Sequence, residues 1–126
     1  MIKRSQEELG RRTAILSEIF DERDRQDAKF GEQNHPPLLW LAIAQEEIGE
    51  AAQAVLHVRE GKPGASLEKY RAEMLQVAAV ALSALEAFDR HPQRCRRCGC
   101  TEVAACPGGC AWLEEDLCTA CGVEPA

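Results

Sequence analysis

Aromatic side chains and long apolar runs are scarce in this sequence. Aromatic residues make up only 5% of the 126 residues, so a packed core has to rest on Leu, Ile, Val and Ala. No apolar run approaches the roughly 20 residues of a membrane-spanning helix, and residues 1–20 are too charged for a secretory signal peptide. These absences favour a cytoplasmic protein with no membrane partner.

An excess of positive charge is also absent. The formal net charge is −6, and residues 1–94 and 95–126 each carry three more acidic than basic side chains. Because a nucleic-acid backbone is held mainly by a basic face, we do not expect nucleic acid as a partner. One short basic cluster stands at the junction and is typical of a solvated linker; its members are Arg90, Arg94, Arg96 and Arg97.

Cysteine is missing from the first 94 residues, and all seven cysteines fall between 95 and 121. This change in composition marks a boundary, which we place between a helical domain at 1–92 and a cysteine-rich module at 93–126. In a chain with no export signal, clustered cysteines favour metal binding over disulfide bonds. The module has few apolar residues, so a metal must supply its folding energy.

Three helices are expected in the first domain. SQEE at 5–8 has the form of a capping box, and the apolar residues after it keep helical spacing to the mid-twenties. After a loop at 29–37, a second helix is expected at 37–59, where the breaker EGKPG ends it. A third helix begins after Ser66 and runs to about Asp89.

The second and third helices are apolar around most of their circumference. Such helices are buried on more than one side. Three helices of this length rarely bury two such elements alone, so we expect a homodimer or homotetramer with a shared core. The predicted fold class is all-α, an antiparallel helical bundle completed by oligomerisation, with a small C-terminal zinc-ribbon-like module.

The segment QEEIGEAAQAVL, at 45–56, carries three glutamates and no basic residue. On a helical wheel Glu47 and Glu50 lie about 60° apart in an otherwise apolar sector, and Glu46 lies just beside Glu50. Gly49 lies among these glutamates. A glycine in a helix interior lowers helix stability relative to alanine, and this loss is tolerable where a ligand or another backbone comes close. The alternative is that this face of the helix is turned to water.

The third helix carries a matching pair, Glu73 and Gln76. If the helices are antiparallel, this pair faces Glu47 and Glu50, and three carboxylates and one amide oxygen converge. Hard oxygen ligands of this kind bind Mg²⁺ or Mn²⁺, and the cation would supply the missing positive charge.

Three segments together resemble one protein family. EEIGE at 46–50, followed by a second helical glutamate, is similar to the EExxE…ExxD signature of the MazG-like all-α nucleoside triphosphate pyrophosphohydrolases. The segments at 22–36 and 73–90 resemble the N-terminal segment and last core helix of phage-type members. The resemblance implies an oligomeric, Mg²⁺-dependent hydrolase that releases pyrophosphate from a nucleoside triphosphate. For a phage-encoded chain, the location is the host cytoplasm.

The resemblance also implies roles for individual residues. Glu47, Glu50 and Glu73 would be ligands of Mg²⁺ or Mn²⁺, and Glu46 would hold a second metal or orient the attacking water. Gln76 stands where the family has Asp, and it brings an oxygen but no charge, so another acidic group such as Glu22 or Asp27 would be needed for full affinity.

Substrate contacts are expected from the loop before the second helix. Lys29, Asn34 and His35 are candidates for contacts with phosphate or base. A surface lysine and a loop histidine are the alternatives for Lys29 and His35, and Trp40 fits a core position better than a stacking platform. Two other functions stay open: a nucleotide-binding protein that Gln76 has made catalytically weak, and an interaction protein in which the zinc module recognises a partner.

The cysteines are spaced as C-x2-C-x-C-x5-C-x3-C-x7-C-x2-C. The outer pairs, Cys95 with Cys98 and Cys118 with Cys121, are separated by nineteen residues, which matches a structural four-thiolate Zn²⁺ site. For the remaining cysteines the alternatives are one zinc with three spare thiols, two zinc ions that share one bridging thiolate, another choice of four ligands, and an iron–sulfur cluster; these cysteines are Cys100, Cys106 and Cys110.

Overall fold

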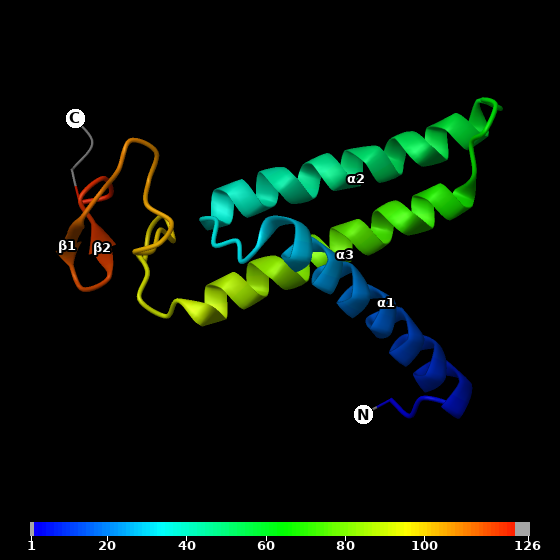
Figure 1. Cartoon of the computed structure of the whole chain (residues 1–126), viewed down its shortest axis with the longest axis horizontal. Coiled ribbons are helices and arrows are strands. Elements are labelled where there is room, and N and C mark those ends of the chain that lie inside the picture. Colours follow the sequence, from blue (N-terminus) through cyan, green and yellow to red (C-terminus); the bar gives the residue numbers. More distant parts are fainter. Residues whose placement is uncertain (1, 123–126) are drawn as a thin grey trace. The chain divides into compact units, whose positions relative to one another are not determined.

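The computed structural model describes residues 2–122. Within them the chain forms three helices and a small two-stranded sheet (Figure 1). The elements are α1 (Gln6–Phe30), α2 (Pro37–Arg59), α3 (Leu67–Arg90), β1 (Trp112–Glu114) and β2 (Leu117–Cys118). The three predicted helices are confirmed, and the fold is mostly helical with a cysteine cluster beside the sheet.

Local signals in the sequence account for the ends of α1. The Ser5 hydroxyl accepts from the Glu8 N–H at 3.1 Å, and the Glu8 carboxylate accepts from the Ser5 N–H at 3.0 Å. This reciprocal pair satisfies two N–H groups that a helix start otherwise leaves unpaired. The helix runs several residues past its expected end, to Gly31, whose φ of 71° suits glycine and stops it.

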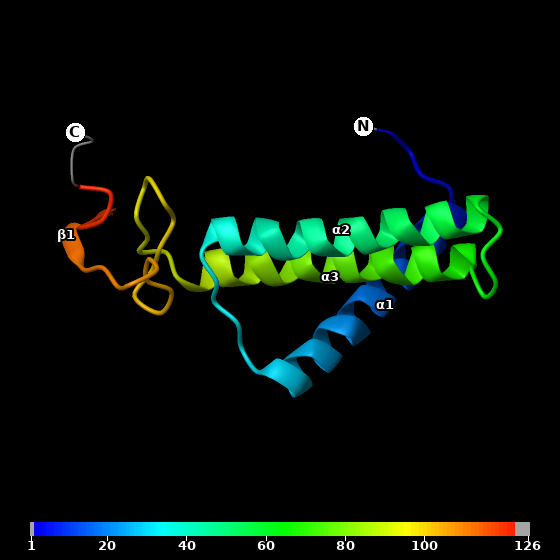
Figure 2. The same ribbon diagram turned by 90° about the horizontal axis from the view of Figure 1, so that it is seen from above.

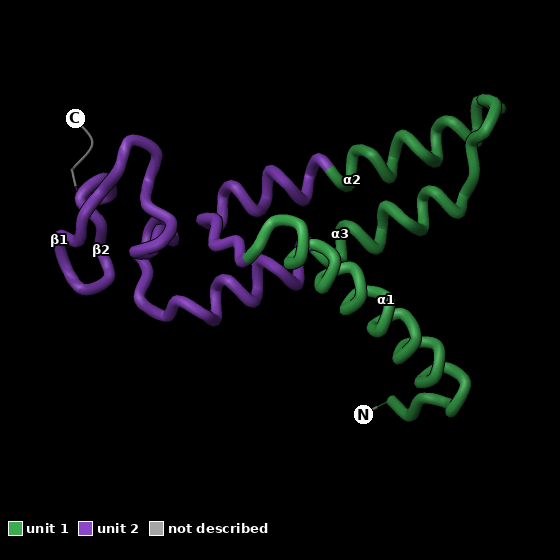
Figure 3. Tube along the Cα trace, in the orientation of Figure 1, with its two compact units in different colours: residues 1–31, 47–79 green, residues 32–46, 80–126 purple. Residues whose placement is uncertain are grey.

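The chain divides into two compact units (Figure 3). Unit 1 comprises residues 1–31 and 47–79, and unit 2 comprises residues 32–46 and 80–126. Both α2 and α3 therefore contribute one half to each unit. The cysteine-rich segment falls in the same unit as the first turns of α2 and the last turns of α3, whereas the boundary at 92/93 stays a prediction.

In unit 1, the C-terminal half of α2 and the N-terminal half of α3 lie side by side and antiparallel (Figures 1 and 2). Small side chains on both helices are buried, among them Ala51, Ala54 and Ala79, which lets the backbones approach closely. The α1 helix is tied to α3 by an ion pair, in which the Arg71 guanidinium donates to Glu18 at 3.0 Å.

Unit 2 contains two small centres of packing. Trp40, Val80 and Ala87 form an apolar core at the helix ends. The cysteine module has its own centre, where Leu117 packs with buried cysteines next to the antiparallel pair β1–β2. The turn at Gly99 passes so close to Pro37 that a Cβ there would lie 2.5 Å from the Pro37 ring, which excludes any larger residue.

The apolar faces of the helices are largely uncovered in the single chain. Large exposed apolar side chains occur on all three helices, including Leu16, Phe20, Leu41, Ile48, Leu56, Met74, Leu85 and Phe88. None of the helices in residues 2–122 is both long and apolar enough to cross a membrane. The faces that the sequence pattern marks as buried thus lack a covering layer within the described residues.

Two helix-interior glycines offer a test of what lies near the glutamates. A Cβ added at Gly10 or Gly49 would meet no described atom within 4 Å. Gly10→Ala and Gly49→Ala should therefore each raise the free energy of unfolding by about 1 kcal/mol, because alanine loses less backbone entropy in a helix. Urea unfolding measures both. If only Gly49→Ala destabilises the protein or promotes dissociation, the open surroundings are contradicted and another chain approaches Gly49.

Candidate functional site

Three glutamates from two helices come together in unit 1. One carboxylate oxygen each of Glu47, Glu50 and Glu73 lies within 4.8 Å of the others. Glu47 and Glu73 are half-buried and Glu50 is exposed. Oxygens around one Mg²⁺ lie about 3.0 Å apart when adjacent and about 4.2 Å when opposite, so small side-chain rotations would let the three oxygens share a cation. The donor set fits a hard divalent ion.

Two further site residues predicted from the sequence lie outside this group. Glu46 is exposed on α2 and falls in unit 2. The Gln76 side chain is engaged with α1, where its amide oxygen accepts from Gln26 at 3.3 Å and its amide also bonds to Glu22. Ligation of a cation by the Gln76 oxygen would compete with its bond to Gln26.

The acidic residues of α1 already have arginine partners. The Arg25 Nε donates to Glu22 at 2.8 Å, and this hydrogen bond, opposed by partial burial and helped by Gln76, lowers the pKa of the Glu22 carboxyl. Arg23, which is buried, donates to Asp27 at 2.9 Å. Beside Glu22 and Gln76 lies a hollow of about 350 Å³ with a charged lining. Glu22 and Asp27 thus have to exchange partners before either could support a cation.

The expected substrate contacts, Lys29 and Asn34, belong to different units. Lys29 is exposed, with its ammonium 4.9 Å from the ring centroid of the adjacent Phe30. Asn34 is half-buried in unit 2, where its carbonyl oxygen accepts from Arg90 at 2.6 Å and its amide donates to Glu32 at 2.9 Å. Asn34 is therefore held in place, whereas Lys29 has an ammonium open to water.

A largely apolar cavity of about 470 Å³ lies within unit 2. Its walls include Asn34, and the His35 ring packs edge-on against Trp40 at a centroid distance of 4.8 Å. Three buried polar atoms of lining residues have no hydrogen-bond partner among the described residues: Trp40 Nε1, His91 Nε2 and Thr101 Oγ1. Each such atom costs about 1–3 kcal/mol when it is left unpaired, and all three are buried away from the open space of the cavity.

The sequence pattern predicts a core position for Trp40, whereas no motif points to His91 or Thr101. Trp40 is indeed buried, at 7% exposure, but it also lines the cavity. No pattern connects His91, in the helix-ending HPQ, with Thr101, in the cysteine module. Only the folding of unit 2 brings them to one cavity.

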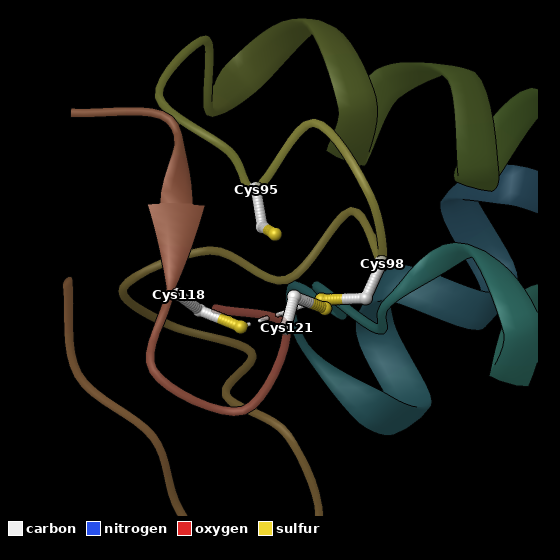
Figure 4. Close-up of side chains that lie close together, drawn as sticks. All are labelled: Cys95, Cys98, Cys118 and Cys121. Atoms are coloured by element: carbon white, nitrogen blue, oxygen red, sulfur yellow. Dashed lines mark hydrogen bonds between the residues drawn. The ribbon is translucent and has the colours of Figure 1, made fainter. Parts of the chain in front are cut away.

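The four outer cysteines converge as their spacing predicts. The sulfur atoms of Cys95, Cys98, Cys118 and Cys121 lie within 4.8 Å of one another, and the side chains point to a common centre (Figure 4). The Cys98 and Cys118 sulfurs are 3.8 Å apart. A tetrahedral site with metal–sulfur bonds of about 2.3 Å has edges of about 3.8 Å, so this cluster can hold a metal ion.

The thiols differ in their ease of ionisation. Burial raises the pKa of Cys106 and of Cys121 to about 12. Burial acts the same way at Cys95 and Cys118, but hydrogen bonds outweigh it, including one from the backbone of Cys118 to Cys95 and one from the backbone of Cys121 to Cys118. Their pKa values fall to about 6 and about 7. Because the thiolate is the form that binds a metal, the lowered pKa values of Cys95 and Cys118 favour metal binding at these two residues.

The arginines of the junction are bound within their own unit. Arg96 pairs with Glu114 at 3.1 Å and with Asp116. Arg97 donates to the Cys121 carbonyl at 2.8 Å. Arg94 donates to the Phe88 carbonyl at 2.6 Å and lies over the Phe88 ring, 3.3 Å from its centroid. These contacts leave less free positive charge than the sequence cluster suggests.

Comparisons with protein-family profiles, curated proteins and solved structures found no match. The resemblance to the MazG-like hydrolases therefore rests on the three sequence segments alone.

Proposed function

We propose that this protein is a metal-dependent hydrolase that converts (deoxy)nucleoside triphosphates to a nucleoside monophosphate and pyrophosphate. The observation that carries the proposal is the convergence of Glu47, Glu50 and Glu73 from α2 and α3. Three carboxylates so close together repel one another, and a divalent cation bound between them would relieve that repulsion. The EEIGE string and the segments that resemble MazG-like enzymes supply the reaction class.

In this proposal, Glu47, Glu50 and Glu73 hold Mg²⁺ or Mn²⁺. A bound cation of this kind neutralises phosphate oxygens and favours in-line attack by water. The role that the resemblance implies for Glu46, a second metal or the orientation of water, is kept as a prediction for this exposed residue. One bond forms between the water oxygen and the α-phosphorus, the bond from that phosphorus to the α–β bridging oxygen breaks, and pyrophosphate leaves. Gln76 supports α1 in this arrangement and is a cation ligand only if its bond to Gln26 opens.

The cysteine module serves in this proposal as a structural zinc appendage. Four thiolates close the coordination shell, which leaves no position for water or substrate. Arg96 is paired with Glu114 and Asp116, so within residues 93–122 its positive charge is not free to hold a nucleic-acid backbone.

The active form of the proposed enzyme is a homodimer or homotetramer. Its support is the set of large apolar side chains left exposed on all three helices. Exposed large apolar side chains on every helix are typical of a chain that associates with other copies. Light scattering coupled to size exclusion would give the mass directly, and a monomer at micromolar concentration would contradict this part of the proposal.

The test of the reaction is a panel of NTPs and dNTPs with Mg²⁺ or Mn²⁺, in which chromatography follows monophosphate and pyrophosphate. The proposal expects both products in equal amounts from at least one nucleotide, and none after chelation. A folded, zinc-loaded protein that releases neither product from any nucleotide would overturn it.

One observation favours a second candidate, a nucleotide-binding protein with weak catalysis. The cavity of unit 2 has aromatic side chains in its walls, among them Trp40 and Phe88, and this lining suits a planar ring. The carboxylate pattern is also incomplete, because the Gln76 amide is committed to α1.

Tryptophan fluorescence separates this candidate from the first. In a Trp112→Phe background, Trp40 is the only tryptophan. A non-hydrolysable triphosphate should then change Trp40 emission with a micromolar Kd. Trp40→Phe in the wild-type chain should weaken binding by up to about tenfold in calorimetry, because the smaller ring loses part of an aromatic contact worth about 0.5–1.5 kcal/mol. Saturable binding that leaves Trp40 emission unchanged would exclude the cavity.

A further inference from the structure

The structure brings a second set of four sulfurs together in the cysteine module. Cys98, Cys100, Cys106 and Cys118 also lie within 4.8 Å of one another. This second quartet shares Cys98 and Cys118 with the first quartet, which consists of Cys95, Cys98, Cys118 and Cys121. Two sets of four that have two members in common contain six different thiols.

We propose that the module holds two zinc ions, with Cys98 and Cys118 as thiolate bridges between them. Cys95 and Cys121 complete the shell of one ion, and Cys100 and Cys106 complete the shell of the other. The inference rests on the zinc module of the proposed function, but not on nucleotide hydrolysis.

The distances in the second quartet fit a metal shell. The Cys98, Cys106 and Cys118 sulfurs form a nearly equilateral triangle with sides of 3.8, 3.8 and 3.9 Å. One face of a tetrahedral zinc–sulfur site has sides of about 3.8 Å. The shared edge, Cys98 to Cys118, has the same length, so it can belong to both shells at once.

Burial and charge also favour two ions. With one zinc in the outer quartet, Cys100 would remain a spare thiol although it is only 2% exposed. Two Zn²⁺ ions with six thiolates carry a total charge of −2, the same as one ion with four thiolates. The second ion therefore adds metal–sulfur bonds without added net charge, in a module whose apolar core is small.

Cys110 belongs to neither quartet in the described part of the chain. Its sulfur lies 3.8 Å from that of Cys100 and accepts from the Cys106 N–H at 3.3 Å. Cys110 therefore lies beside two ligands of the second ion and is assigned to neither shell. This makes Cys110 a matched control for Cys106, since both are half-buried cysteines of the same loop.

The experiment is a metal count on the full chain, purified with zinc and dialysed against metal-free buffer. Elemental analysis should find two zinc ions per chain. Cys106→Ser should retain one, because it removes a ligand of the second shell only, and Cys110→Ser should retain two. Titration with Co²⁺ supplies a reading that needs no variant: two ions that share a sulfur lie within about 4.6 Å, so their spins couple and the EPR signal falls as the second equivalent binds.

The outcomes are distinguishable. One zinc in the wild-type chain, with Co²⁺ EPR intensity that never falls, would overturn the second site and leave the single-zinc module intact. If elemental analysis finds no bound metal, both the single-zinc module and the second zinc site are overturned. If it finds iron together with acid-labile sulfide, the module holds an iron–sulfur cluster and both zinc assignments are overturned. Equal loss in Cys110→Ser and Cys106→Ser would overturn the ligand assignment. Hydrolysis of nucleotides has no bearing on any of these readings.

Discussion

Glu50→Gln is expected to lower kcat/KM for triphosphate hydrolysis by about 100-fold or more. The substitution keeps the size of the side chain but removes one negative charge from a cluster of three carboxylates. A divalent cation bound by the two remaining carboxylates is held less tightly and neutralises phosphate charge less well. Steady-state kinetics over a range of Mg²⁺ concentrations should show a higher Mg²⁺ requirement as well as a lower maximum.

A glutamate that lies on α3 but outside the cluster serves as the control. Glu68 is exposed in the first turn of α3, so Glu68→Gln should leave the kinetics within about twofold of wild type. Glu47→Gln should behave like Glu50→Gln, because both belong to the cluster. If both variants fold and hydrolyse at the wild-type rate, the cluster is not the active site, and the proposal then has to be abandoned for these residues.

Cys118→Ser is expected to release all metal from the cysteine module and to unfold it. Cys118 is 1% exposed and lies in strand β2. It belongs to both quartets of cysteines, so its loss removes a ligand from each. Structural zinc contributes an apparent 10–16 kcal/mol, roughly, to small domains of this kind. Limited proteolysis should therefore cut between residues 95 and 122, and elemental analysis should find no zinc. The α-helical circular dichroism should remain for the most part, since unit 1 contains no cysteine.

Cys110→Ser is the comparison for this experiment, because Cys110 lies in the same module but in neither quartet among the described residues. It should keep its zinc and resist protease. A Cys118→Ser chain with a full metal complement would show that the cluster does not depend on Cys118. Retained protease resistance without zinc would show that the module folds without metal.

Periodicity and local capping were enough to predict the helices. The capping box at Ser5 and Glu8 and the helix breakers after Arg59 involve residues only a few positions apart. The structure confirms the helix that begins after this capping box and the helix that ends at these breakers. The outer cysteine pairs were predictable for a similar reason, because each C-x2-C needs only one turn of chain to place two sulfurs together. The convergence of Glu47, Glu50 and Glu73 followed from helical spacing and a short loop.

Tertiary structure decided the features that depend on distant segments. Sequence spacing pointed Gln76 toward the cation, but the crossing of α1 over α3 supplies Gln26 and Glu22 as competing partners. The cavity of unit 2 has walls from three separate stretches of chain, 34–44, 80–94 and 99–101, and no periodic pattern in the sequence predicts that they come together.

The sharing of Cys98 and Cys118 was likewise absent from the spacing. Cysteine spacing defines which sulfurs are near along the chain, whereas the path of the loop between them decides which thiols meet. The sequence by itself therefore determined the helices, the acidic cluster and the outer thiol pairs, because short-range backbone geometry dictates them. The partners of Gln76, the cavity and the second quartet were decided only by the fold, because they arise from contacts between segments far apart in sequence.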